Sequence, residues 1–391
     1  MVLSNMEGFF DEAKKQALGS LFNGKEKGRP VVGIYCTYCP KELVIAAGAI
    51  PVSLCGTSND TIGAAEKRLP SNLCPLIKSS YGYAITDTCP FFSSSDIIIG
   101  ETTCDGKKKM FELMQELKPV HVMHLPNLFD ITDESNLHLW VQEVRKLKRY
   151  LEDNLQVSIT DDKLRQAIKL VNEEKQLMKN ICYLNTANPP VINGTGLLSI
   201  NVSTNFLGEK GESTNALHNL YEYIMQEYKK CYEHVNLEFE QHRPRILLTG
   251  CPVGIGTEKV IRLVEESGGN VVAMENCSSY KTLEIRPDPD ATDPLESIAK
   301  EYLKIPCSCM SPNNYRIELL KQLINDFAIH GIIDLTWQAC HTYNIEAHYI
   351  EQLARSEEIP YLHLESDYSP SDEGHLKVRI DALLEMLSSS S

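Results

Sequence analysis

Short apolar runs separated by amphipathic helical stretches fill the first third of the chain. Strand-like runs occur at 31–35, 50–54, 96–100 and 120–125. They are rich in Val and Ile, and glycine-containing or polar turns bound them, as expected of buried strands. Because parallel strands need a crossover connection, usually a helix, this alternation predicts parallel βαβ units.

The same alternation resumes after residue 244, with strand-like runs at 245–250, 270–275, 331–337 and 360–365. Helix-like runs separate them, and 375–387 predicts a last helix. We therefore expect a second parallel α/β unit that resembles the first, although the sequence carries no strong internal repeat.

The middle of the chain has a different character. Apolar residues recur there at three- and four-residue spacing, with charges on the other faces, which predicts helices. An Asn- and Gly-containing loop at 185–196 is expected to interrupt them. We predict an α/β fold with two parallel-sheet, Rossmann- or flavodoxin-like domains at 1–133 and 245–391, joined by a helical segment at 134–244.

Thirteen cysteines are the unusual part of the composition. In a chain of 391 residues without a recognisable secretory signal, metal binding or catalysis is a commoner use of cysteine than a disulfide framework. A free cysteine can also pack as a small hydrophobe, and we expect this of about half of them. Cys182 and Cys231, inside helical stretches, are the clearest examples.

Five cysteines follow the carboxyl ends of predicted strands, namely Cys36, Cys104, Cys251, Cys277 and Cys340. In open α/β sheets that edge is where ligands bind. Cysteines kept only for packing should also fall within strands and helices. Their concentration on one edge therefore predicts a binding site between the two domains.

Other cysteines lie in predicted loops. Cys74 precedes a helix, where free N–H groups favour a thiolate, and Cys89, Cys307 and Cys309 lie in loops of their own. Only the pair Cys36 and Cys39 has CxxC spacing, whereas structural zinc usually takes two such pairs. Thiolate ligands select iron–sulfur, zinc or copper(I), so an iron–sulfur cluster, thiol redox chemistry and structural packing all stay open.

Several polar residues near this edge are candidate proton donors: Glu42, Glu101, Asp105, His341 and Tyr343. We take Glu42 and His341 as the catalytic candidates, although each such residue alone is more often a helix cap or a surface group. Three lysines, Lys107, Lys108 and Lys109, could offset the charge of a cluster or form a solvated helix start. His121 and His124 flank a strand and are expected to be packed or solvated.

The loop 250–259, GCPVGIGTEK, follows a strand and opens a helix. It lacks the Gly-Lys-Ser/Thr ending of a phosphate-binding P-loop, so we expect a tight glycine turn and no ATP site. The net charge of −15 argues against nucleic acid and anionic membranes as partners. No apolar run is long enough to span a bilayer, and the start does not resemble a secretory signal, which predicts a cytoplasmic protein.

Long motifs around these cysteines resemble the 2-hydroxyacyl-CoA dehydratase superfamily. They include YCTYCPKELVIAAGAIPVSLC, LPSNLCPLIKSSYGYAITDTCPFF, IIIGETTCDGKKKMFELM and GIIDLTWQACHTYNIE. In its dehydratase branch, the resemblance implies a 4Fe–4S cluster on three cysteines, here Cys74, Cys104 and Cys340. An ATP-hydrolysing activator would inject one electron, and a ketyl radical mechanism would remove water from a 2-hydroxyacyl thioester.

KSSYG and GETTCDGKKKM are more similar to a second branch, the double-cubane cluster proteins. There the resemblance implies an 8Fe–9S cluster held by six cysteines in each subunit of a homodimer. An ATP-dependent reductase with its own iron–sulfur cluster would supply electrons in an oxygen-free cytoplasm, for reduction of small molecules such as acetylene, azide or hydrazine. A non-enzymatic electron-transfer or cluster-carrying protein is a third possibility.

The resemblance implies the three ligands of the dehydratase pattern, and three more are chosen among the other cysteines expected at the same edge. The six cysteines selected are Cys36, Cys74, Cys104, Cys277, Cys309 and Cys340. The alternates are Cys39, Cys89, Cys251 and Cys307.

Overall fold

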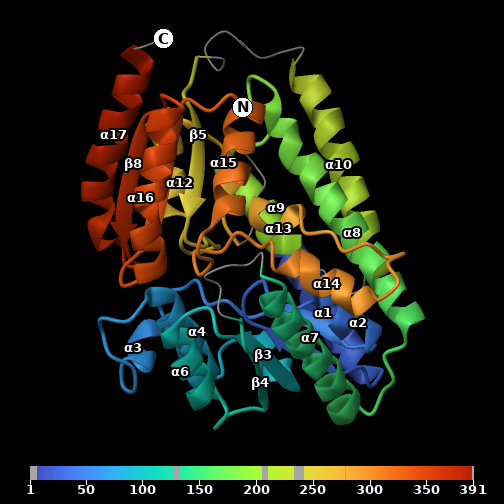
Figure 1. Ribbon diagram of the computed structural model, residues 1–391. Coiled ribbons are helices and arrows are strands. Elements are labelled where there is room, and N and C mark those ends of the chain that lie inside the picture. The colour runs from blue at the N-terminus through green and yellow to red at the C-terminus, as the bar shows by residue number, and fades with distance from the viewer. Residues whose placement is uncertain (1–6, 127–132, 205–209, 233–241, 278, 390–391) are drawn as a thin grey trace.

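Two four-stranded parallel sheets organise the computed structural model, which describes residues 7–126, 133–204, 210–232, 242–277 and 279–389 (Figure 1). The first sheet has the order β2-β1-β3-β4 and consists of β1 (Val31–Ile34), β2 (Ile50–Ser53), β3 (Ile97–Glu101) and β4 (Val120–Met123). The second has the order β6-β5-β7-β8 and consists of β5 (Arg245–Gly250), β6 (Asn270–Glu275), β7 (Gly331–Trp337) and β8 (Tyr361–Ser366). Both sheets thus have the same topology, and the predicted α/β fold with two parallel sheets is confirmed.

Five helices belong to the first sheet's connections: α2 (Lys41–Ala46), α3 (Ile62–Ala65), α4 (Pro75–Thr86), α5 (Pro90–Ser94) and α6 (Asp105–Met114). Proline stands at the first position of α4 and of α5, where its missing N–H costs no hydrogen bond. Cysteines hold the N-cap positions of α4, α5 and α6, so these helix starts follow directly from cysteine-containing loops.

Long helices lie between the two sheets in the sequence, and a further helix precedes the first strand: α1 (Glu7–Glu26), α7 (Glu134–Leu155), α8 (Asp161–Tyr183), α9 (Gly194–Thr204) and α10 (Lys210–Tyr232). The expected 185–196 loop ends earlier than predicted, because α9 begins inside it. Asn193 Oδ1 accepts the Gly196 N–H at 3.0 Å and so caps the new helix. The Asn-Gly composition that predicted a loop is here a helix start.

The remaining helices cover the second sheet or connect its strands: α12 (Lys259–Glu266), α13 (Tyr280–Leu283), α14 (Pro294–Tyr302), α15 (Asn314–Asp326), α16 (His341–Ser356) and α17 (Glu373–Ser389). Among the described residues, no helix is both long and apolar enough to cross a bilayer.

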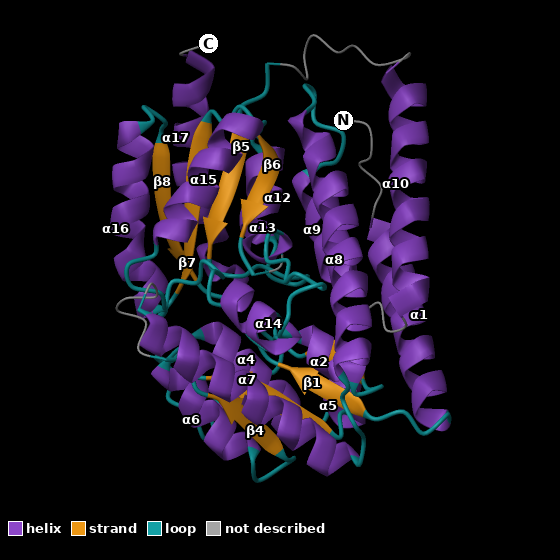
Figure 2. Ribbon diagram, turned by 45° about the vertical axis from the view of Figure 1, so that its right-hand side comes forward, coloured by secondary structure: helices purple, strands orange, loops and turns teal. Residues whose placement is uncertain are grey.

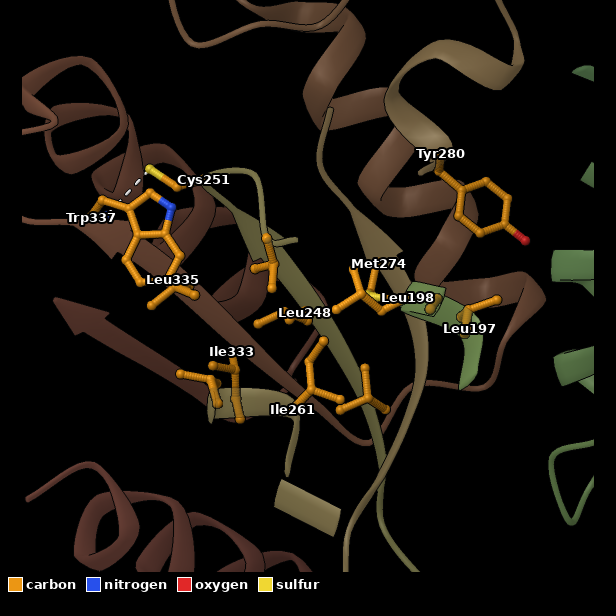
Figure 3. Close-up of a cluster of buried hydrophobic side chains, with 14 of the residues drawn as sticks. Leu197, Leu198, Leu248, Cys251, Ile261, Met274, Tyr280, Ile333, Leu335 and Trp337 are labelled. Carbon is orange, nitrogen blue, oxygen red and sulfur yellow. Dashed lines mark hydrogen bonds between the residues drawn. The ribbon is translucent and has the colours of Figure 1, made fainter. Parts of the chain in front are cut away.

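The second sheet has a continuous apolar core. Every residue of β5, β6 and β7 is buried, as expected of parallel strands with both faces covered. Figure 3 shows Leu248 of β5, Met274 of β6 and Ile333 of β7 packed among side chains of neighbouring helices. This rigid sheet fixes the direction in which its strand-end loops point.

Helices from the middle and the end of the chain connect the two sheets. Helix α8 contacts α2 beside the first sheet and α13 beside the second, and α14 packs against α7. Figure 2 shows α8 running along both halves, with α14 between the sheets. The boundaries 1–133, 134–244 and 245–391 stay a prediction, but the packing shows that residues from all three ranges share contacts.

A glycine in α4 provides a test of the packing that holds the Cys74 loop. A Cβ on Gly82 would lie 2.2 Å from the carbonyl oxygen of Thr61, just before α3. Gly82→Ala should therefore lower the free energy of unfolding by about 1–3 kcal/mol, because α4 must move away. Urea denaturation measures this change.

Gly63→Ala on α3 is the matched control, since nothing lies within 4 Å of its Cβ position. It should be neutral or stabilise by up to about 1 kcal/mol, because alanine favours the helix. Equal urea midpoints for the two variants would contradict the close approach of α3 and α4.

Candidate functional site

The carboxyl ends of the two sheets face each other, and cysteine thiols gather between them. Cys36 follows β1 of the first sheet, and Cys277 follows β6 of the second. Their thiols lie within hydrogen-bonding reach of each other. Residues more than two hundred positions apart in the sequence therefore meet at one interface.

Four thiols form what we call the first thiol group: Cys36, Cys277, Cys307 and Cys309. Cys307 and Cys309 are within hydrogen-bonding reach of each other, and the charge of Cys36 acts on both. The proximity of Cys277 lowers the pKa of Cys36 well below its ordinary value. The same contact, together with burial, raises the pKa of Cys277.

A second thiol group comprises Cys74, Cys104, Cys251 and Cys340. Hydrogen bonds from Cys251 and Cys74 lower the pKa of Cys340 to about 3. Burial raises the pKa of Cys104, and the charges of Cys340 and Cys36 add to this effect. Cys104 therefore lies between the two thiol groups.

Helix starts and unusual backbone conformations position these sulfurs. Cys74, Cys104 and Cys340 are the N-cap residues of α4, α6 and α16. The Cys104 Sγ accepts the Lys107 N–H at 3.5 Å. Cys36 has a φ of 70° and Ala339, before Cys340, a φ of 61°. Non-glycine residues adopt such left-handed conformations rarely, and often at functional sites.

Aromatic side chains cover both thiol groups. The Tyr38 hydroxyl lies 3.8 Å from Cys309 Sγ and donates to the carbonyl oxygen of Ile305 at 3.1 Å. Beside the second group, the rings of Trp337 and Tyr368 meet edge to face with centroids 5.0 Å apart. The Trp337 backbone N–H donates to Cys251 Sγ at 3.3 Å (Figure 3). These contacts cover part of each group, whereas several of its cysteines keep partial exposure.

Two buried lysines place positive charge at the first thiol group. Lys281 is 1% exposed and forms an ion pair with Glu275 at 3.2 Å. Burial opposes the charge of Lys281, but Glu275 and Cys277 outweigh it and raise the pKa of the lysine. Lys107, also buried, lowers the pKa of Cys36 through its charge.

A buried carboxyl group, Glu101, also lies beside Cys36. Glu101 ends β3, and its Oε1 accepts the Tyr38 N–H at 2.9 Å. Burial raises the pKa of Glu101 well above its ordinary value, and the charge of Cys36 adds to this. The side chain is thus biased toward its neutral form beside a thiol.

A cavity of about 190 Å³ opens at the first thiol group. Cys36, Cys55 and Cys277 line one part of it, and Lys175 and Tyr302 line another. The cavity reaches residues of both sheets and of α8, so it lies at the junction of all parts of the fold.

No group of three or more His, Cys, Asp or Glu side chains within the described ranges is arranged to hold a single metal ion. The thiols are instead spread over two neighbouring groups, and the charge of Cys36 of the first group acts on Cys104 of the second.

The chain matches the family model described as 2-hydroxyglutaryl-CoA dehydratase, D-component, over residues 36–387. The chain belongs to this family. It is 44% identical to "Putative dehydratase subunit YjiM" of Escherichia coli (strain K12), with 97% of both chains covered. The resemblance expected from the cysteine motifs is therefore confirmed at the level of the family.

More distant relatives have different reactions in their names. The (R)-phenyllactyl-CoA dehydratase beta subunit of Clostridium sporogenes is 22% identical over 98% of this chain and 100% of its own length. One of the benzoyl-CoA reductase subunits of Thauera aromatica is 24% identical over 42% of each chain. The family thus includes proteins named for dehydration and for reduction.

In this family member, the structure brings all six selected cysteines to one interface: Cys36, Cys74, Cys104, Cys277, Cys309 and Cys340. Of the alternates, Cys251 and Cys307 lie within the groups. Cys39 is buried near Glu101 and Glu42, and Cys89 caps α5 near Tyr35. Cys182 is buried elsewhere and donates to Asn201 Oδ1, whereas the side chain of Cys231 lies outside the described residues.

The candidate proton donors fall into two classes. Glu42, Glu101 and Tyr343 are buried, whereas Asp105 and His341 are exposed. Of the lysine run, Lys107 is buried and Lys108 and Lys109 are exposed. His121 stacks on Tyr150 with ring centroids 4.4 Å apart, and His124 is exposed.

Cys55, which lies just past β2 and lines the cavity, was not predicted as a site residue. The rule that singled out the other strand-end cysteines would have found it. Lys281 was also missed, because nothing in the sequence distinguishes a buried lysine from an exposed one.

The loop 250–259 packs against the first sheet's side of the interface. A Cβ on Gly254 would lie 2.5 Å from Thr57 Cγ2, and the Thr57 hydroxyl donates to the carbonyl oxygen of Ile255 at 2.8 Å. Its glycines thus permit a close contact between the two halves.

Arg316 provides a test of the charge network behind the first thiol group. It is fully buried and donates to Glu275 Oε2 at 3.1 Å, to Thr249 Oγ1 at 2.9 Å and to Glu346. Arg316→Met should lower the free energy of unfolding by about 3–5 kcal/mol, because buried carboxylates lose their partner. Urea denaturation measures the loss.

Arg355→Met is the control, since Arg355 is 75% exposed and pairs with Glu351 on the same helix. Its effect should stay within about 0.5 kcal/mol. Similar losses for both variants would show that the buried network does not stabilise the fold.

Proposed function

We propose that the chain holds a double-cubane iron–sulfur cluster between its two sheets and uses it to reduce small molecules. The supporting observation is the presence of two adjoining thiol groups, each with enough sulfurs for one cubane. A single 4Fe–4S cluster would need only one of them. Soft thiolate donors in a buried, aromatic-walled interface suit iron–sulfur ligation.

Each cubane would take three cysteines. Cys36, Cys277 and Cys309 would hold the first, with Cys307 as the alternate. Cys74, Cys104 and Cys340 would hold the second, with Cys251 as the alternate. Cys39, which lines the cavity together with Cys36 and Cys277, and Cys89 are the remaining alternates.

The cluster would supply low-potential electrons, and the surrounding residues would adjust it. Lys281 and Lys107 offset negative charge at the first thiol group. Tyr38, Trp337 and Tyr368 limit access of water to the sulfurs. Charge, burial and hydrogen bonds to sulfur are the means by which a protein sets the potential of such a centre.

Electrons would come from an ATP-dependent reductase or activator protein with its own iron–sulfur cluster, and the chain would act as a homodimer. The names of the relatives support partners, because they describe subunits. The loop 250–259 lacks the ending of a P-loop and packs against Thr57. This agrees with hydrolysis of ATP by a separate protein.

The second candidate is a 2-hydroxyacyl-CoA dehydratase subunit with one 4Fe–4S cluster. The names of the family model and of the Clostridium sporogenes relative favour it. In that case Cys74, Cys104 and Cys340 would hold the cluster, and the first thiol group would stay free. Loss of water from a 2-hydroxyacyl-CoA, with the activator present, would identify this activity.

Iron content separates the two candidates. Anaerobically purified protein should carry about eight iron atoms per chain for a double cubane and about four for a single cubane. Cys277→Ser should lower the iron content by about half or more in the first case and leave it unchanged in the second, since serine is a poor ligand for these clusters. Iron and sulfide assays with electron paramagnetic resonance measure this.

Cys182→Ser is the control, because Cys182 is buried outside both thiol groups. Its iron content should match that of the wild type. Full iron content in Cys277→Ser, with about eight irons in the wild type, would show that the ligands of the first cubane were chosen wrongly.

A further inference from the structure

A lysine lines the cavity beside the first thiol group, in addition to the thiols. Thiols line one part of it, and Lys175 of α8 lines another. Reduction of a small molecule consumes protons as well as electrons, so a cavity with an electron source needs an acid. We propose that the Lys175 ammonium is the proton donor for this reduction, an inference that rests on the proposed function.

The position of Lys175 depends on the helices that meet around it. Helix α8 contacts α2, α13 and α14 along this stretch. The Lys175 Nζ donates to the carbonyl oxygen of Ile285 at 2.6 Å and lies 5.3 Å from the centre of the Tyr302 ring. An ammonium group has three N–H bonds, and one described hydrogen bond leaves the others for a molecule in the cavity.

Glu42 is the positioning residue behind this lysine. It is fully buried on α2, and its Oε2 accepts the Tyr302 hydroxyl at 2.8 Å. Its Oε1 has no hydrogen-bond partner among the described residues and lies 3.9 Å from Lys175 Nζ. The carboxylate thus holds the ammonium at the cavity wall, so Glu42, predicted as catalytic, would act through Lys175.

The surroundings also ease release of the proton. Burial lowers the pKa of Lys175, and the positive charges of Lys41 and Arg286 act in the same direction. The carboxylates of Glu42 and Glu174 oppose the shift without cancelling it. A lysine with a lowered pKa is a better general acid near neutral pH than a solvated one.

The proposed reduction can be written in full for acetylene, the probe used in the experiment below. Acetylene takes two electrons and two protons and becomes ethylene, and the electrons come from the reduced iron–sulfur partner protein through the cluster. For each of the two C–H bonds that form, one N–H bond of Lys175 breaks and its electron pair stays on nitrogen, and the two electrons supplied to acetylene break one of its π bonds. Lys175 is protonated again between the two transfers. Water that enters the open cavity returns the proton.

Four variants of the full-length, cluster-loaded protein test the proposal, and one of them, Lys175→Ala, serves for rescue by an added amine. Lys175→Met removes the acid, and Lys175→Arg keeps the positive charge but cannot give up a proton at working pH. Lys179→Met is the control, because Lys179 lies one turn later on α8, pairs with Glu284 at 2.6 Å and does not line the cavity.

Lys175→Met and Lys175→Arg should form ethylene about 100-fold more slowly than the wild type. Their iron content and the paramagnetic resonance spectrum of the reduced cluster should be unchanged, and Lys179→Met should behave as the wild type. Methylamine should restore part of the activity of Lys175→Ala, because it can occupy the vacated space and donate a proton.

A wild-type rate in Lys175→Met, or rescue by Lys175→Arg, would overturn the proposal, since charge alone would then suffice. Absence of amine rescue, with iron content retained, would also count against it. Failure of the proposed function is distinguishable, because the wild-type protein itself would then lack the cluster or form no ethylene.

Discussion

The approach of two parallel sheets, carboxyl end to carboxyl end, is the constraint on which the centre of this molecule depends. Loops leave a parallel sheet at that edge, so each sheet directs its cysteines toward the other. Contacts such as Thr57 with Ile255, and Tyr368 with the carbonyl oxygen of Gly56, hold the edges together. With the sheets in this position, eight thiols gather in two neighbouring groups.

Gathering thiolates in a partly buried interface is electrostatically unfavourable unless positive charge accompanies them. Lys281 and Lys107 supply that charge from the two halves of the chain. Lys281 is in turn held by Glu275, which also accepts from Arg316. The buried ion pairs behind β6 therefore connect the stability of the second sheet with the chemistry at its edge.

Much of the fold could be predicted from the sequence, because apolar strand-like runs and helical periodicity are local signals. The strands 245–250, 270–275 and 331–337 were predicted at their observed bounds. Helix α9 was missed, since Asn and Gly are typical of both loops and helix starts. Strand-end position was a sufficient signal for Cys36 and Cys277, but the burial of Lys281 and the cavity beside Lys175 depend on tertiary packing that no local pattern records.

Each thiol group draws its members from both halves of the chain. Cys36 meets Cys277 and Cys307 across the interface, and Cys74 meets Cys340 in the same way. Neither half alone supplies all the cysteines of a group. A bound inorganic centre would therefore cross-link the two halves. Assembly of such a centre would have to follow docking of the two sheets, and its loss would loosen the whole molecule.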